Sequence, residues 1–445
     1  MSANISLKAT WNHDPLPAAE QTSLGYLLVD VTQPDAPIQP AVPVENQVLN
    51  LNLVLDTSGS MAGAKLQNLK KAVAWVIDNL SARDTLSITL FDDEVHPLVP
   101  ATHVEDRDAL RAQIDAIREA GGTAMSKGLT VGLQEARNAP APGAVSRIVV
   151  LTDGQTWGDG DVCVELARQA GDAGIPITCL GVGAEEDWSI ELLDAIARES
   201  GGEVGYIEKP EEIEQAFAST MRRMQSTLAR NLRVTFTPAA GVSARAVYRV
   251  APLISRLWPA MDDASSSEAG ASAEPQTGGT ATSLSLPLGD LQSADGQTLL
   301  FEVVLPPRRP GSYRLARLLL EYETGDPANP KGDTALDIVA DFTAAPVTGP
   351  GNARVMNSVE KATTFKLQTR ALQASMVGDN AAATRNLRAA ATRLLNLGET
   401  ELAQAAEREA ERIESEGKAS PAATKKLTFD TRKLSVSETV HLKEE

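Results

Sequence analysis

The stretch LNLNLVLDTSGS, residues 49–60, decides the fold of the largest predicted domain. Its first half, Leu49–Leu55, is a short apolar run that ends at polar turn residues, which is typical of a buried strand. Its second half, Asp56–Ser60, gathers carboxylate and hydroxyl side chains around a glycine. We therefore expect a central strand that ends in an oxygen-rich loop.

From this strand outward, apolar runs alternate with amphipathic helical stretches, as in a parallel sheet covered on both faces. The predicted strands are Leu49–Leu55, Leu86–Phe91, Arg147–Thr152, Ile177–Val182 and Val204–Ile207. The predicted helices are Lys65–Leu80, Arg107–Arg118, Ser126–Ala136, Asp161–Ala173, Ile190–Ser200 and Glu211–Met224. Residues 47–226 are therefore predicted to form an α/β doubly wound, Rossmann-like domain.

The segments on either side of this domain carry short strand patterns. Residues 1–46 contain loosely alternating strands and a proline-rich connector, and residues 227–345 contain further strands. Because a few strands are not stable alone, the two segments are expected to pair in one all-β sandwich into which the α/β domain is inserted. The Ser-, Ala- and Gly-rich stretch 262–282 is predicted to be a disordered loop.

The C-terminal part of the chain is rich in Ala, Leu, Arg and Glu, with breaks at Gly378 and Gly398. Residues 352–416 are predicted to form a helical hairpin or bundle of three helices, near 353–377, 380–397 and 400–416. Residues 417–445 are polar and are predicted to be a disordered basic tail.

Composition narrows the function classes. The 445 residues suggest roughly two to four domains, and the formal net charge of -18 disfavours nucleic acid as a partner. No apolar run is long enough to span a membrane and no signal sequence opens the chain, so we expect a cytoplasmic protein without membrane insertion. Cys163 and Cys179 are expected to be core residues.

Three oxygen-rich loops can meet at one edge of the predicted sheet. They are Asp56–Ser60, Gly121–Thr123 and Thr152–Gly154, and the carboxyl edge of such sheets is where ligands bind. Oxygen ligands select Mg²⁺, with Mn²⁺ or Ca²⁺ as alternatives, over zinc. Two carboxylates and three hydroxyls leave a cation electrophilic toward one more anion, such as a partner's carboxylate. The alternative is that these residues only cap helices and form turns.

This pattern resembles the complete metal-ion-dependent adhesion site (MIDAS) of the von Willebrand factor A (VWA) family, over residues 47–220. The residues at the motif positions are Asp56, Ser58, Ser60, Thr123 and Asp153. The resemblance implies direct coordination by Ser58, Ser60 and, with ligand bound, Thr123, and contacts through water from Asp56 and Asp153. A partner's Asp or Glu would complete the coordination shell.

The N-terminal β segment and helical region resemble, less specifically, bacterial VWA scaffold proteins found near Ser/Thr kinases and forkhead-associated (FHA) domains. In the tail, Thr424 and Thr431 each precede a leucine at the third position, which suits phosphorylation by a Ser/Thr kinase and recognition by an FHA-domain protein. The alternative is a solvated basic tail that contacts the acidic body of the same molecule.

An enzyme is not expected. The chain has no HExxH, GxxxxGK[ST] or GxSxG motif, and the segment Asp92–Glu94 is interpreted as a solvated turn rather than as part of the site. Two functions remain open. The first is a metal-dependent protein–protein interaction module or scaffold, regulated by threonine phosphorylation of the tail. The second is a structural subunit of a larger assembly in which the metal only stabilises the fold.

Overall fold

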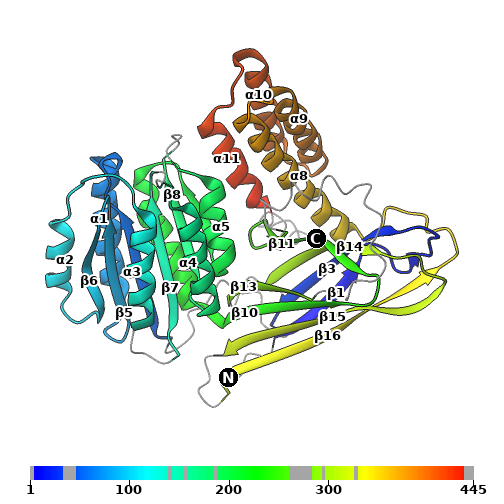
Figure 1. Ribbon diagram of the computed structural model, residues 1–445, viewed down its shortest axis with the longest axis horizontal. Coiled ribbons are helices and arrows are strands. Elements are labelled where there is room, and N and C mark those ends of the chain that lie inside the picture. The colour runs from blue at the N-terminus through cyan, green and yellow to red at the C-terminus, as the bar shows by residue number, and fades with distance from the viewer. Residues whose placement is uncertain are drawn as a thin grey trace.

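The computed structural model describes residues 5–33, 47–138, 143–154, 156, 158–183, 188–259, 283–292, 296–324 and 329–434. Most of the predicted proline-rich connector and the whole of the predicted loop 262–282 lie outside these residues. Figure 1 shows an α/β unit, a group of long strands beside it and a helical unit above both.

The α/β domain is built on a six-stranded sheet in the order β6-β5-β4-β7-β8-β9. Its strands are β4 (Leu49–Asp56), β5 (Thr85–Phe91), β6 (Val95–His103), β7 (Val145–Thr152), β8 (Ile177–Val182) and β9 (Glu203–Ile207). All pairings are parallel except that of β5 with β6. The predicted α/β fold is confirmed, and β4, fully buried along its length, lies at its centre.

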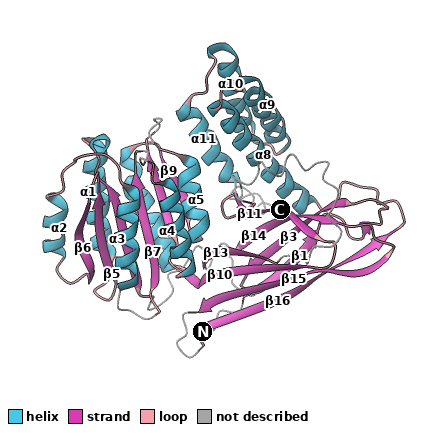
Figure 2. Ribbon diagram, viewed as in Figure 1, coloured by secondary structure: helices cyan, strands magenta, loops and turns pink. Residues whose placement is uncertain are grey.

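Helices cover both faces of this sheet (Figure 2). They are α1 (Ala64–Asn79), α2 (Arg107–Asp115), α3 (Met125–Asn138), α4 (Gly160–Asp172), α5 (Ile190–Ser200) and α6 (Ile213–Gln225). One buried cluster joins α1, α2 and α6 to the sheet, and a second cluster joins α3, α4 and α5. Each helix therefore buries one apolar stripe, as its spacing predicted.

Two five-stranded sheets draw strands from both sides of the α/β domain in the sequence. Their orders are β1-β3-β14-β11-β12 and β13-β10-β15-β16-β2. The strands are β1 (Ser6–Trp11), β2 (Leu16–Pro17), β3 (Ser23–Thr32), β10 (Thr227–Pro238), β11 (Ser243–Ala251), β12 (Ser255–Trp258), β13 (Leu284–Gln292), β14 (Gln297–Leu305), β15 (Gly311–Thr324) and β16 (Lys331–Thr343). β3 pairs along its length with β14, and one hydrophobic cluster contains residues of both sheets.

The helical unit contains α8 (Ala353–Met376), α9 (Asn380–Asn396), α10 (Thr400–Glu416) and α11 (Pro421–Arg432). The first three match the predicted helices. Their shared cluster with α11 also includes Leu28 and Tyr248 of the β1-β3-β14-β11-β12 sheet, so the helices pack on that sheet. No helix among the described residues is long and apolar enough to cross a membrane.

The prediction of a disordered tail from residue 417 is wrong for α11. Ser420 caps this helix, since its side chain accepts a hydrogen bond from the Ala423 N–H, and Pro421 occupies the first turn. Leu427 is buried in the cluster of the helical unit, whereas Phe429 is buried in the α/β domain. These two apolar side chains anchor an otherwise polar helix. Residues 435–445 lie outside the described part of the chain.

Candidate metal centre

Asp56 is the last residue of β4, and its side chain is fully buried. Because β4 lies between the parallel strands β5 and β7, the loops after all three meet at one edge of the sheet. Asp56 Oδ1 accepts a hydrogen bond from the Ser58 N–H at 2.8 Å, and Oδ2 accepts one from Thr152 Oγ1 at 2.6 Å. These bonds fix the carboxylate at the base of the edge.

The charge of Asp56 is incompletely balanced by the protein. Burial raises the pKa of its carboxyl group from 3.8 to about 6; the hydrogen bonds from Ser58 and Thr152 oppose this rise, and the nearby charge of Asp153 adds to it. An ionised carboxylate that is buried without enough compensation favours a cation beside it.

Ser58, Ser60 and Asp153 form a connected row of oxygens. The Oγ atoms of Ser58 and Ser60 are 3.0 Å apart, and Ser60 Oγ donates to Asp153 Oδ1 at 2.6 Å. Ser58 and Asp153 are buried, whereas Ser60 is exposed. The row therefore leads from the interior of the domain to its surface, which gives a partner group access to one end of it.

Thr123 completes the predicted set from the loop before α3. A hydrogen bond of 2.8 Å from the Ala120 N–H to the Thr57 carbonyl joins this loop to the loop after β4. A Cβ placed on Gly154 would lie 3.0 Å from Thr123 Oγ1, so glycine permits the loop after β7 to approach the hydroxyl. The structure thus brings all five predicted residues to one edge of the sheet.

Residues 92–94 form a bend in which Asp93 and Glu94 are exposed, in agreement with the interpretation as a solvated turn, but the Asp93 carboxylate also lies at this edge. A Cβ at Gly121 or Gly122 would come within 2.6 Å of an Asp93 carboxylate oxygen, so that carboxylate packs on the glycine backbone. Gly121 has a φ of +59°, which favours glycine. The sequence shows that residues 92–94 carry carboxylates, but it does not show where each side chain points. It therefore could not place Asp93 beside the glycines.

Lys65 is the functional-site residue that the sequence analysis missed. It lies in the first turn of α1, and its Nζ is 2.5 Å from Asp153 Oδ2. The Lys65 side chain is 19% exposed and that of Asp153 is 0% exposed. Its distance in sequence from Asp153 explains the omission, because a lysine at a helix start has many possible neighbours.

These residues fit a hard divalent cation. Every candidate donor is a carboxylate or hydroxyl oxygen, which suits Mg²⁺, Mn²⁺ or Ca²⁺ better than zinc. Within the described ranges, no group of three or more His, Cys, Asp or Glu side chains is arranged to hold a metal. A site here therefore depends on its hydroxyls as well as on Asp56 and Asp153.

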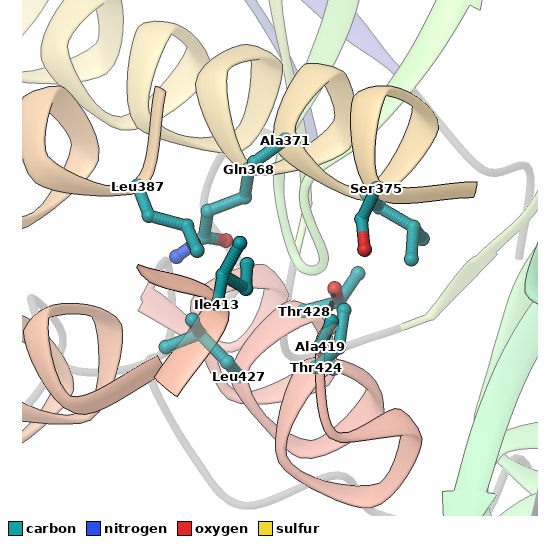
Figure 3. Close-up of a pocket in the computed structure, with 10 residues that line it drawn as sticks. Gln368, Ala371, Ser375, Leu387, Ile413, Ala419, Thr424, Leu427 and Thr428 are labelled. Carbon is teal, nitrogen blue, oxygen red and sulfur yellow. Dashed lines mark hydrogen bonds between the residues drawn. The ribbon is translucent and has the colours of Figure 1, made fainter. Parts of the chain in front are cut away.

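The two predicted phosphorylation sites lie on α11, far from the candidate centre in the sequence. Thr424 is half-buried, with its Oγ1 3.4 Å from Glu409 Oε1, and Thr431 is fully buried. Figure 3 shows Thr424 and Thr428 at a cavity between the helices, opposite Ser375. The premise of a flexible, accessible segment is wrong, so the structure gives no reason to propose a kinase or an FHA-domain partner.

Comparisons with known families agree with two parts of this architecture. The family of the von Willebrand factor type A domain matches residues 50–219, and the Sll0103-like C-terminal alpha-helical domain matches residues 353–437. The chain therefore contains a VWA domain followed by a C-terminal helical domain. The second match includes α11, in agreement with a folded helix there.

Individual relatives have been found among curated proteins and solved structures. The chain is 31% identical over 282 residues to the uncharacterized protein sll0103 of Synechocystis sp., covering 63% of this chain and 62% of that protein. It is 26% identical to the uncharacterized protein YfbK of Escherichia coli, covering 51% and 39%. The matches thus span less than two thirds of either relative.

A solved von Willebrand factor type A protein from Catenulispora acidiphila superposes on this chain with a TM-score of 0.73. The superposition covers 97% of each chain at 19% sequence identity. At this identity the likeness concerns the fold alone, and it extends beyond the VWA domain to nearly the whole chain.

Proposed function

We propose that the VWA domain of this chain holds a divalent cation, Mg²⁺ by preference, and through it binds an acidic side chain of a partner protein. The observation that carries the proposal is the hydrogen-bonded row Ser58–Ser60–Asp153 beside the buried Asp56, which opens to solvent at Ser60. This arrangement presents oxygen ligands to a cation while leaving one side of it accessible.

Each proposed ligand has a distinct electrostatic role. Asp56 and Asp153 supply negative charge, and Ser58, Ser60 and Thr123 supply neutral oxygens. With only two formal charges on its ligands, a bound divalent cation would attract one further carboxylate. The buried Asp56, held by Ser58 and Thr152, keeps the loop in position whether or not a partner is present.

We infer a binding rather than a catalytic role. Both carboxylate oxygens of Asp56 accept hydrogen bonds. Those of Asp153 are bonded to Ser60 and Lys65. Both side chains are also buried, so neither carboxylate reaches a substrate at the surface, as a general base must.

We infer that the remaining domains serve as a scaffold for this module. The two five-stranded sheets form a sandwich interrupted by the VWA domain, because β3 precedes that domain and pairs with β14 after it. The buried pair Arg147–Asp290, at 2.8 Å, connects β7 of the VWA domain to β13 of the sheets. A scaffold of this kind would hold the site in a fixed orientation toward a larger assembly.

The test combines metal titration with partner capture. Calorimetric titration of the chelator-treated full chain with MgCl₂ should show one binding site, and the double variant Ser58→Ala/Ser60→Ala should lose it. Capture of proteins from extract should then require both Mg²⁺ and the intact serines. Ser415→Ala, an exposed serine on α10, is the matched control and should behave like the wild type.

Two results would contradict the proposal. If the wild-type chain binds no divalent ion, the site is not a metal centre. If it binds Mg²⁺ but captures the same partners in EDTA, the cation is structural, and the chain acts as a subunit whose other surfaces make the contacts.

A further inference from the structure

Lys65 places a positive charge against one of the two carboxylates of the candidate centre. Its ammonium is 2.5 Å from Asp153 Oδ2, while the other oxygen of Asp153 accepts from Ser60. The Asp153 side chain has no exposed surface. Lys65 therefore bonds one oxygen, and Ser60 the other, of a carboxylate that a divalent cation would share.

The ammonium is held in this place by its surroundings. Lys65 is in the first turn of α1, a helix whose apolar stripe is buried against the sheet. A Cβ on Gly183, after β8, would lie 3.8 Å from Lys65 Nζ. The carbonyl of Gly183 is in turn fixed by a 3.1 Å hydrogen bond from Trp188 Nε1. The ammonium of Lys65 thus lies between Asp153, after β7, and Gly183, after β8, and four fifths of the side chain is buried.

This position changes the formal charge of the site. Asp56 and Asp153 contribute two negative charges and Lys65 one positive charge, so these three side chains together carry one net negative charge instead of two. A divalent cation would meet a like charge at close range, which opposes its binding. Once bound, however, it would retain one uncompensated positive charge, which a partner's carboxylate can neutralise.

We propose that Lys65 is an intrinsic competitor for the divalent cation and makes binding of the cation dependent on the partner's carboxylate. This proposal rests on the proposed function and specifies its regulation. With Lys65 in place, the cation alone binds weakly, and the cation with a carboxylate binds well. By linkage, the carboxylate raises the affinity for the cation by the same factor as the cation raises the affinity for the carboxylate.

The change in Mg²⁺ affinity caused by Lys65 can be estimated from the way nearby charges shift ionisation equilibria. One charge within a few ångströms shifts such an equilibrium by about ten- to a thousand-fold. Lys65→Met removes the charge and keeps much of the side-chain length. We therefore expect its affinity for Mg²⁺ to exceed that of the wild type by about tenfold or more.

The experiment is calorimetric titration of the chelator-treated full chain with MgCl₂, first in sodium chloride and then in sodium acetate of equal ionic strength. Acetate is the carboxylate probe. The wild type should bind Mg²⁺ more tightly in acetate than in chloride. Lys65→Met should bind tightly in both solutions, and Lys65→Arg, which retains the charge, should behave like the wild type.

A second variant guards against misfolding. Lys65→Met leaves the buried Asp153 without its cationic partner, whereas Lys65→Gln removes the charge and keeps a hydrogen-bond donor. Circular dichroism in EDTA shows which of the two is folded, and that variant is used. If the wild type binds Mg²⁺ and the neutral variant binds it no more tightly than Lys65→Arg does, this proposal is overturned and the proposed function is not. An absence of Mg²⁺ binding in the wild type and in every variant overturns the proposed function as well.

Discussion

Replacing Asp56 by Asn should stabilise the metal-free protein although it removes a proposed metal ligand. The pKa of Asp56 is about 6 in the folded chain, against 3.8 as its ordinary value, chiefly because of burial. An acid whose pKa is raised on folding binds its proton more tightly in the folded state. Ionisation of Asp56 therefore costs stability above the folded pKa, and this cost disappears as the pH falls through about 6 to about 4.

The magnitude follows from this shift. About two pKa units at 1.36 kcal/mol each correspond to about 3 kcal/mol of destabilisation at neutral pH. Asn removes this cost but has one acceptor oxygen, whereas Asp56 accepts hydrogen bonds from both Ser58 and Thr152. Losing one such bond costs about 1 kcal/mol. We therefore expect Asp56→Asn to raise the free energy of unfolding by about 2 kcal/mol in EDTA at pH 7.5.

The assay is urea denaturation followed by circular dichroism. In EDTA at pH 7.5 the variant should unfold at higher urea concentration than the wild type with an unchanged slope, and this advantage should be lost as the pH falls to about 4. Asp333→Asn, at an exposed position on β16, should change the free energy of unfolding by less than about 0.5 kcal/mol. A variant that is less stable than the wild type in EDTA at pH 7.5 would refute the reasoning.

Three further predictions concern other parts of the chain. Burial raises the pKa of Cys163 to about 12 and that of Cys179 still further, so iodoacetamide at pH 8 should modify neither thiol until urea unfolds the protein, as mass spectrometry would show. Phe429→Ala should lower the free energy of unfolding by about 3 kcal/mol in urea titration, whereas Lys426→Ala, which breaks an exposed ion pair, should change it by less than about 1 kcal/mol. Thr431, which is fully buried, should remain unmodified when the folded chain is incubated with a Ser/Thr kinase, and detection of phosphothreonine there in native protein would contradict the docking of α11.

The sequence was sufficient to predict a strand or a site where one physical rule determines its position. The apolar run 49–55 had to be buried, and parallel strands place the loops after them at one edge, so Asp56, Ser58 and Asp153 could be assigned to one site. It was insufficient for β6, which carries Pro97 and Pro100 and has no regular alternation of apolar and polar residues. Such a strand is tolerated because it lies at the antiparallel edge of the sheet.

The helix α11 and its position could not be predicted from the local sequence pattern, for a different reason. Its residues are mostly polar, and its stability comes from contacts with segments distant in sequence. Phe429 stacks with Tyr206 at a ring-centroid distance of 5.5 Å and lies 6.2 Å from Trp188. Arg432 pairs with Asp194 through two hydrogen bonds of 2.7 and 2.8 Å. Periodicity within residues 417–434 carries no information about these partners.

These contacts place the helical domain within reach of the candidate centre. Phe429 of α11 packs against Trp188, and Trp188 holds the carbonyl of Gly183. Gly183 lies beside Lys65, which is paired with Asp153. Since each of these contacts is direct, α11 fixes the residues after β8 that enclose the ammonium of Lys65. The environment of the site is therefore set by the VWA domain together with the C-terminal helical domain, so a metal titration of the isolated residues 47–226 would not measure the same site as a titration of the full chain.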